Sequence, residues 1–221
     1  MTTAYKIDLH THSITSHDGG LGVAHYKKAL DDGLLDYIAI TDHNRIDYAL
    51  LMQQELGERI IVGEEIMTQK GEIIGLYLKE PIRPELSLAE TVARIKEQDG
   101  LVYIPHPFET VRKGLHPADL EDIEELVDII EVCNGRVFAQ NRSAQAVVWA
   151  KLNHTAGAAS SDAHGFRGLG KTYTRVSQPP TRENLVKLVK IGTSITDRPG
   201  LRALLYPKYH RLRKRLRKGN P

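Results

Sequence analysis

Histidines and carboxylates recur along this chain at spacings that suit a metal ion. His10 and His12 lie two residues apart, and alternating apolar residues before them predict a strand over residues 5–9. Because side chains two apart on a strand share a face, both imidazoles can reach one ion. Asp162 and His164 repeat this spacing. Each pair is also compatible with ordinary histidines and acids, so the positions of the other candidates decide between the two interpretations.

The elements that must position these side chains alternate between strands and helices. Short apolar runs predict strands over 5–9, 37–41, 59–63, 72–78, 101–105, 127–132 and 156–159, with further short strands over 173–176 and 193–195. Helical patterns cover 21–32, 46–56, 86–98, 118–126, 141–152 and 182–189. This alternation is typical of a parallel sheet covered by helices. We therefore expect one α/β domain over residues 1–200 and a separate tail over 201–221.

In parallel α/β folds the functional side chains gather at the carboxyl ends of the strands. The candidates that fall there or in nearby loops are His10, His12, Asp18, His43, Glu65, Glu72, His106, Glu131, Asp162 and His164. Imidazole together with carboxylate suits Zn²⁺, Mn²⁺ or Fe²⁺ rather than Ca²⁺. So many ligands exceed the needs of one ion and are enough for two or three. For single residues an interpretation without metal binding stays open: a helix start at His43, a turn at His106, exposed carboxylates at Glu64 and Glu65.

Five ordered segments resemble the PHP (polymerase and histidinol phosphatase) family. They are Asp8-Leu9-His10-Thr11-His12, Thr41-Asp42-His43-Asn44, Gly63-Glu64-Glu65-Ile66, His106-Pro107 and Ser161-Asp162-Ala163-His164. The resemblance spans residues 5–177 and is to the small stand-alone members. It implies a distorted (β/α)₇ barrel with a trinuclear metal centre that hydrolyses phosphoesters. The ligands it implies are His10, His12, His43, Glu65, His106, Asp162 and His164, and catalytic roles are predicted for Glu65, His106 and Asp162.

Two departures from the family pattern affect the predicted ligands. Many members have Ser-Asp-Gly after the first motif, whereas this chain has Ser16-His17-Asp18-Gly19. We expect Asp18 to be the ligand, with His17 as the alternative. Glu72 stands where relatives often carry histidine; glutamate binds the same metals, so the site is expected to fill but its metal preference is open.

Residues around the predicted site have two interpretations each. Arg112, Arg136 and Arg167 lie after strand ends and are predicted to bind substrate, or else are solvent-exposed charges. Glu131 is expected to contact substrate or to support a ligand. Asp42 is expected to orient the neighbouring His43 or to cap a helix.

Composition sets the outer bounds. The chain has 221 residues, of which 41% are hydrophobic and 26% charged, as in ordinary globular proteins. No apolar run is long enough to span a bilayer, and the N-terminus lacks the apolar core of a signal peptide. Cys133 is the sole cysteine, so no intrachain disulfide forms and a cytoplasmic location is expected. Cys133 also lacks the C-x₅-R context of a cysteine phosphatase.

Positive charge is concentrated at the C-terminal end. Residues 201–221 carry eight basic side chains and no acid, leaving 22 basic and 28 acidic side chains in residues 1–200. The tail is either a disordered, solvated end or a segment, 202–218, that binds nucleic acid or an anionic surface. From the sequence we expect that removing residues 203–221 leaves turnover of small substrates intact.

The predicted function is metal-dependent hydrolysis of a phosphate ester of a small metabolite or nucleotide, with two or three divalent ions (Mn, Zn or Fe). Such ions activate water and neutralise phosphate charge. Amide or ester hydrolysis by the same centre is the second enzymatic interpretation. A non-catalytic, metal-stabilised module that binds an anionic partner through its tail is the third.

Overall fold

A computed structural model describes residues 4–136 and 140–218. Its strands form one mixed sheet in the order β7-β6-β5-β4-β3-β2-β1-β8-β9. The strands are β1 (Tyr5–Asp8), β2 (Tyr37–His43), β3 (Ile60–Met67), β4 (Glu72–Leu76), β5 (Leu101–Ile104), β6 (Ile129–Asn134), β7 (Ala156–Ser160), β8 (Thr172–Val176) and β9 (Thr193–Thr196). Every strand expected from the sequence is present, with ends that differ by a few residues.

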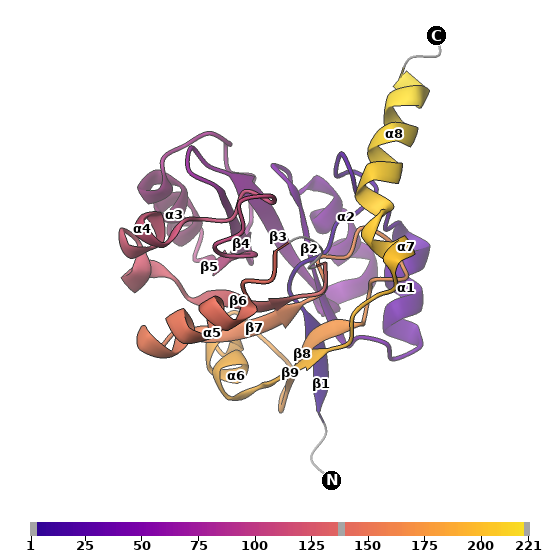
Figure 1. Cartoon of the computed structure of the whole chain (residues 1–221). Coiled ribbons are helices and arrows are strands. Elements are labelled where there is room, and N and C mark those ends of the chain that lie inside the picture. The colour runs from indigo at the N-terminus through magenta and orange to yellow at the C-terminus, as the bar shows by residue number, and fades with distance from the viewer. Residues whose placement is uncertain (1–3, 137–139, 219–221) are drawn as a thin grey trace.

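Helices lie around the outside of the curved sheet (Figure 1). They are α1 (Val23–Asp31), α2 (Asp47–Leu56), α3 (Leu88–Glu97), α4 (Pro117–Glu121), α5 (Ser143–Leu152), α6 (Leu185–Ile191), α7 (Leu201–Leu204) and α8 (Tyr206–Lys218), with 3₁₀ turns η1 (Gly57–Arg59) and η2 (Glu124–Leu126). The helix expected over 118–126 is therefore two short pieces. Within the described ranges, no helix combines the length and apolar character needed to cross a bilayer.

The sheet is not all parallel, which corrects the expectation from the sequence. The β1-β2-β3 and β5-β6-β7 groups are parallel, but β4 runs antiparallel to both β3 and β5. The reason is the short connection: only residues 68–71 separate β3 from β4, and parallel neighbours need a much longer crossover. As a result the first residue of β4, Glu72, lies at the same end of the sheet as the carboxyl ends of its neighbours.

The sheet curls into a nearly closed barrel. Thr11, after β1, bridges Ala163, after β7, and the His12 N–H donates to the Ala163 carbonyl at 2.9 Å. Farther from this end, β8 pairs antiparallel with β1, and its Thr174 hydroxyl hydrogen-bonds the backbone of Ala159 on β7. This architecture confirms the expected distorted PHP-type barrel, and it places the segments that follow β1 and β7 side by side.

Alternation along the strands produces two apolar layers. On β2 and β3, Ile38, Ile40, Ile60 and Val62 face the outer helices, whereas the residues between them face the interior of the barrel. Helix α6 contributes Leu185, Leu188 and Val189 to the inner layer. One end of the barrel interior is thus apolar, and the polar residues gather toward the carboxyl ends of the strands.

The C-terminal segment is helical and projects away from the barrel (Figure 1). This differs from the disordered end that was one of two expectations. The N-terminal part of α8 packs so closely on loops of the barrel that only glycine fits beneath two of its rings. A side-chain carbon at Gly20 would lie 2.3 Å from the His210 ring, and one at Gly165 would lie 2.6 Å from Tyr206. Helix α8 therefore docks where Asp18 and His164 are located.

Candidate metal centre

Strand ends bring the predicted ligands together at one end of the barrel. His10 and His12 follow β1, His106 follows β5, and Asp162 and His164 follow β7. His43 and Glu65 are register partners on β2 and β3. Glu72 reaches the same end because β4 is reversed, and Asp18 comes from the loop before α1. Their ligand atoms form four overlapping groups, each within 4.8 Å.

The innermost group consists of His10, His12, Glu65 and Asp162. The Nε2 atoms of His10 and His12 are 3.1 Å apart, and they lie 3.4 and 3.3 Å from the two oxygens of Glu65. Asp162 Oδ1 is 3.4 Å from His12 Nε2 and 3.7 Å from His10 Nε2. A tetrahedral ion with bonds of about 2.0–2.2 Å keeps its ligand atoms about 3.3–3.6 Å apart. The arrangement therefore fits an ion among these four side chains.

A second group surrounds the other side of Glu65. His106 Nε2 lies 3.0 Å from Glu65 Oε1 and 3.6 Å from Glu72 Oε2. His43 Nδ1 lies 3.1 Å from Glu65 Oε2 and 3.5 Å from Glu72 Oε1. Glu65 thus faces both groups, one carboxylate between two sets of ligands.

A third group lies nearest the cavity mouth and contains Asp18, His43 and His164, with His12 adjacent. Asp18 Oδ1 is 3.3 Å from His164 Nε2 and 3.5 Å from His43 Nε2. The His17 side chain is 58% exposed and reaches no closer than 3.7 Å to Asp18. The geometry favours Asp18 over His17 as the ligand.

The protonation states also suit cations. Burial would raise the pKa values of Glu65 and Asp162, but histidines near Glu65 and Arg136 and His10 near Asp162 hold both well below their usual range. Burial and the neighbouring His164 lower the pKa of His12 to about 3, leaving a neutral imidazole. Two ionised carboxylates and the neutral imidazole of His12 can bind a divalent transition metal as they stand. Burial would lower the pKa of His10, but the carboxylates of Asp162, Glu65 and Glu131 raise it well above its usual value, so His10 must release a proton to bind the ion.

Negative charge is in excess around Glu72. Burial and the nearby carboxylate of Glu65 raise the pKa of Glu72 well above its usual value. Burial alone would lower the pKa of His43, but Glu65, Asp18 and Glu72 outweigh it and raise that pKa to about 9. A bound cation would relieve the repulsion between the two carboxylates, which supports the fit of the second group.

Both carboxylate oxygens of Glu131 contact candidate ligands and their neighbours. Its Oε1 accepts from the Tyr103 hydroxyl at 2.9 Å and faces His10 Nδ1 at 3.3 Å. Its Oε2 accepts from the His106 N–H at 2.6 Å and from Asn134 Nδ2 at 2.8 Å. Such partners fix the orientation of a ligating histidine. Of the two roles expected for Glu131, these contacts favour the support of ligands.

Two candidate ligands have backbones in the left-handed region, which is sparsely populated by residues other than glycine. The φ angles are 29° at His106 and 48° at Asp162. Such conformations persist only where surrounding contacts enforce them, and they cluster at functional sites. The Glu131 hydrogen bond to the His106 N–H is one of these contacts.

Neighbouring acids have structural roles. Asp42 accepts hydrogen bonds from the Ser13 N–H, the Ser13 hydroxyl and the Thr15 hydroxyl at 2.5–2.7 Å. Asp42 therefore holds the loop after β1 in place. It neither orients His43 nor caps a helix, which were the two roles expected for it. The Glu64 carboxylate points away from the ligands and accepts from the Ile82 N–H at 2.8 Å, so Glu65 is the member of the pair that reaches the centre.

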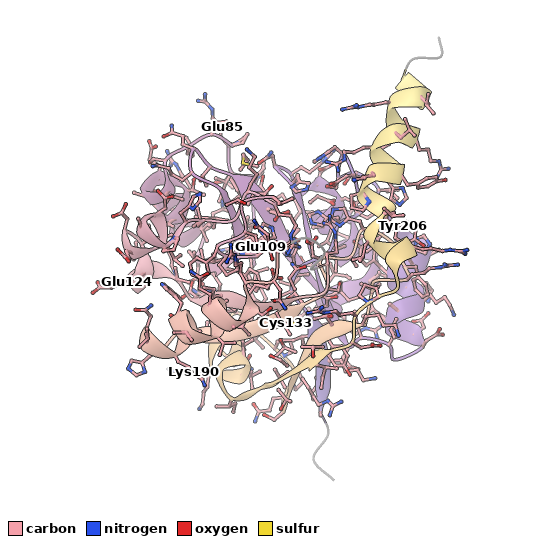
Figure 2. The ribbon with its side chains drawn as sticks, in the orientation of Figure 1. Glu85, Glu109, Glu124, Cys133, Lys190 and Tyr206 are labelled. Carbon is pink, nitrogen blue, oxygen red and sulfur yellow. The ribbon has the colours of Figure 1, made fainter. Side chains whose placement is uncertain are left out.

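A cavity of about 620 Å³ opens above the ligands. Arg112 and Arg136 line it: Arg112 Nη1 donates to Asp162 Oδ2 at 2.8 Å, and Arg136 Nη1 donates to Asp162 Oδ1 at 3.0 Å. Glu109, near the centre of the view in Figure 2, holds Arg112 through two further hydrogen bonds. Arg167 is exposed and outside this lining, so it is not near the predicted substrate.

Helix α8 contributes residues that sequence reasoning missed. Lys208 and Arg211 line the cavity from above, together with Leu204, Leu205 and Pro207. Tyr206, labelled in Figure 2, marks the foot of this helix. The only available signal was the basic composition of the tail, which indicated an anionic partner but not a position. Residues of the tail and of the barrel therefore line one cavity.

Comparisons with known proteins agree with this geometry. A family model described as PHP-associated matches residues 140–194. The uncharacterized protein MJ0417 of Methanocaldococcus jannaschii is 33% identical over 186 residues, which cover 78% of this chain and 71% of that one. With the ordered motifs and the barrel, these matches show that the chain belongs to the PHP family.

Solved structures share the fold. A two-domain protein of Bacteroides vulgatus, which contains a predicted PHP-like metal-dependent phosphoesterase, superposes with a TM-score of 0.71 at 22% identity, over 95% of this chain and 70% of that one. Endonuclease Q, solved with a 27-mer duplex bearing an abasic lesion at its active site, gives a TM-score of 0.60 at 15% identity, over 87% of this chain and 58% of that one. At these identities the likeness extends to the fold alone.

Proposed function

We propose that this protein is a metal-dependent phosphoesterase that holds two or three divalent ions (Mn, Zn or Fe). One observation carries the proposal: four overlapping groups of potential ligands, two of which share Glu65, lie at a cavity that Arg112 and Arg136 also line. When bound, such ions lower the pKa of a coordinated water toward neutrality and neutralise the oxygens of a phosphate.

The side chains of the chain have distinct parts in this proposal. His10, His12, Glu65 and Asp162 would hold the innermost ion; Glu65, Glu72 and His106 the second; Asp18 and His164 the outermost. His43 lies between the last two and would bind one of them, since a neutral imidazole has a single lone pair to donate. Among these, Glu65, His106 and Asp162 are the groups we assign to the reaction itself. They are all buried, so they would act in a region of low water content, where electrostatic interactions are strong.

Arg112 and Arg136 are assigned to the phosphate. Both guanidinium groups face the cavity beside Asp162. Arg136 uses only Nη1 in this contact, so its planar guanidinium can still give a phosphate two parallel hydrogen bonds. Four of the five N–H groups of Arg112 already bind Glu109, Asn134 and Asp162, so Arg112 contributes mainly positive charge. Lys208 and Arg211 add positive charge from the opposite wall. A cavity with cations on two walls favours an anionic substrate such as a phosphorylated metabolite or a nucleotide.

A nucleic acid is the second candidate substrate, and the basic helix at the mouth of the cavity favours it. Helix α8 carries Lys208 and Arg211 into the cavity and further basic residues beyond it. Endonuclease Q, which shares the fold, binds duplex DNA. Lysine and arginine along an exposed helix can follow a phosphate backbone.

Product formation from a panel of substrates tests the proposal, measured as free phosphate from monoesters and as shortened strands from DNA. The metal-free protein is reconstituted with Mn²⁺, Zn²⁺ or Fe²⁺ and given sugar phosphates, nucleotides, single-stranded DNA and abasic duplex DNA, beside p-nitrophenyl phosphate and matched carboxylic ester and amide analogues. We expect phosphoester turnover that chelator abolishes and that falls at least 100-fold in His12→Ala. Turnover of only the ester or amide analogues would contradict the proposal, as would metal-independent turnover.

A further inference from the structure

The loop that carries Asp18 is held from the far end of the chain. The ammonium of Lys214 on α8 donates to three backbone carbonyls of this loop: those of Ile14 at 2.8 Å, Gly19 at 2.9 Å and Ser16. Lysine has three N–H donors, so all of them are satisfied by one loop. We infer that Lys214 is a positioning residue that fixes the Asp18 loop and thereby sets how tightly the outermost metal ion binds.

The two halves of the loop are held in different ways. Asp42 binds the first half through Ser13 and Thr15, from within the barrel. Asp18 lies in the second half, whose backbone turns at Gly19; there a side-chain carbon would lie 2.1 Å from the Ser13 carbonyl oxygen. Lys214 binds Ile14 and Ser16 before Asp18 and Gly19 after it, so it ties the half that Asp42 holds to the half that Asp42 does not reach.

The contact is built into the docked helix and is not a chance surface pairing. His210, one turn before Lys214, fits against Gly20, and Tyr206, one turn earlier, fits against Gly165 next to His164. These three residues fall on or near one side of α8. That side lies over the two segments that supply Asp18 and His164, two of the three outermost ligands.

Charge supports the same assignment. Burial lowers the pKa of Lys214, while the carboxylates of Asp18 and Asp42 oppose that shift, so the ammonium lies within their field. The carbonyl oxygens of Ile14, Ser16 and Gly19 all accept from this ammonium. In the described part of the chain, a side chain without donors there would leave Ser16 with only the Gly19 N–H, at 3.3 Å, and remove the side-chain donor of Ile14 and Gly19. We therefore expect the Asp18 loop to open more often without this ammonium.

The inference rests on the proposed metal centre, and Zn²⁺ binding by the full chain tests it. Lys214→Met keeps the length of the side chain and removes the charge and donors; Arg213→Met is the matched control, since Arg213 is the exposed neighbour on the same helix. We expect the weakest-bound Zn²⁺ to lose about 10–100-fold in affinity in Lys214→Met, the range for residues that support a ligand, with tighter ions unaffected. Arg213→Met should match the wild type, and Asp18→Asn should lose the same ion.

Hydrogen exchange of the metal-free protein supplies a second readout. We expect faster deuterium uptake over residues 13–20 in Lys214→Met than in Arg213→Met, with the barrel strands unchanged. A wild type that binds Zn²⁺ beside a Lys214→Met variant with unchanged affinities would overturn the inference alone. A wild type that binds no divalent ion would overturn the proposed function and the inference together.

Discussion

Glu65 contacts more of the candidate ligands than its single carboxylate would suggest. His10, His12, His43 and His106 all place a ring nitrogen within 3.4 Å of one of its oxygens. A ligand shared between two ions couples their occupancy, because each ion helps to keep the carboxylate ionised and in place. The histidines contributed by β1, β2 and the end of β5 therefore depend on one residue of β3.

The choice between Asp18 and His17 gives a prediction about single residues. Asp18→Asn removes a charged ligand from the outermost group, whereas His17→Asn changes an exposed ring. We expect Asp18→Asn to bind one ion fewer per chain and to lose at least tenfold in turnover. His17→Asn should retain its metal content and stay within about threefold of the wild type. Elemental analysis after dialysis measures the first quantity; the reverse pattern would make His17 the ligand.

Most of the candidate ligands could be predicted from the sequence because their positions follow from strand ends. The two-residue spacing and the position after an apolar run made His10 with His12, and Asp162 with His164, candidates, and the resemblance to the PHP family implied the same ligands. The role of Glu131 was left open between substrate contact and support of a ligand. Its partners Tyr103, His106 and Asn134 meet it through the curvature of the barrel, and no spacing in the chain encodes that contact.

Among the elements, the direction of β4 could have been predicted from the short connection that precedes it. Only residues 64–71 separate the strands expected over 59–63 and 72–78, and a connection this short forces the second strand to run antiparallel. The sheet was nevertheless expected to be parallel. The consequence for the site is large, since reversal of β4 is what brings Glu72 to the ligands at the start of the strand rather than at its end.

Strand β3 carries a second acid whose burial predicts pH-dependent stability. Glu64 accepts one hydrogen bond from Ile82, and its other oxygen is buried without a partner among the described residues. Burial raises the pKa of Glu64 to about 7. The folded state therefore binds more protons than the unfolded state between about pH 4.5 and 7, and the free energy of unfolding falls as the pH rises through this window.

Glu64→Gln should remove this penalty, because the amide oxygen can still accept from the Ile82 N–H. We expect the metal-free variant to match the wild type near pH 4.5 and to exceed it by about 1–3 kcal/mol in free energy of unfolding at pH 8. Urea unfolding at both values measures the difference. Glu85→Gln, the same change at an exposed position (Figure 2), is the control. A gain that is equal at both pH values would show that the charge is not responsible.

Helix α8 was the element least accessible to sequence reasoning. Apolar residues recur at helical spacing in this segment, so the pattern indicates a helix despite the high charge; they are Leu205, Tyr209, Leu212 and Leu216. Its docking position could not be predicted, because two kinds of contact fix it. Aromatic rings of α8 fit against glycines of the barrel loops, and the Lys214 ammonium donates to backbone carbonyls. Such contacts depend on shape and have no compositional signature.

For the molecule as a whole, the cavity has one wall from the barrel and one from the C-terminal helix. Removing residues 203–221 would take away Lys208, Arg211 and the contact to the Asp18 loop together. We therefore now expect truncation to impair turnover, the reverse of the expectation from the sequence.

A double variant separates substrate binding from the loop contact. Lys208→Ala with Arg211→Ala removes two cavity cations while Lys214 is kept. We expect KM for an anionic substrate to rise at least tenfold, with kcat and metal content nearly unchanged, because these groups attract the substrate without touching the reacting atoms. Steady-state kinetics at two salt concentrations measure KM and kcat. Added salt should raise the KM of the wild type and so reduce its difference from the double variant. A fall in kcat with constant KM would contradict this assignment.

The bond between Lys214 and the Asp18 loop also has a consequence for biosynthesis. A ribosome adds about 5–20 residues per second, so Asp18 is polymerised about 10–40 seconds before Lys214. During that interval a nascent chain can form β1 and β2 but lacks the ammonium that steadies the loop between them. For the proposed metal centre, tight binding at the outermost position would be postponed until translation is nearly finished, and partial translation products should bind that ion poorly.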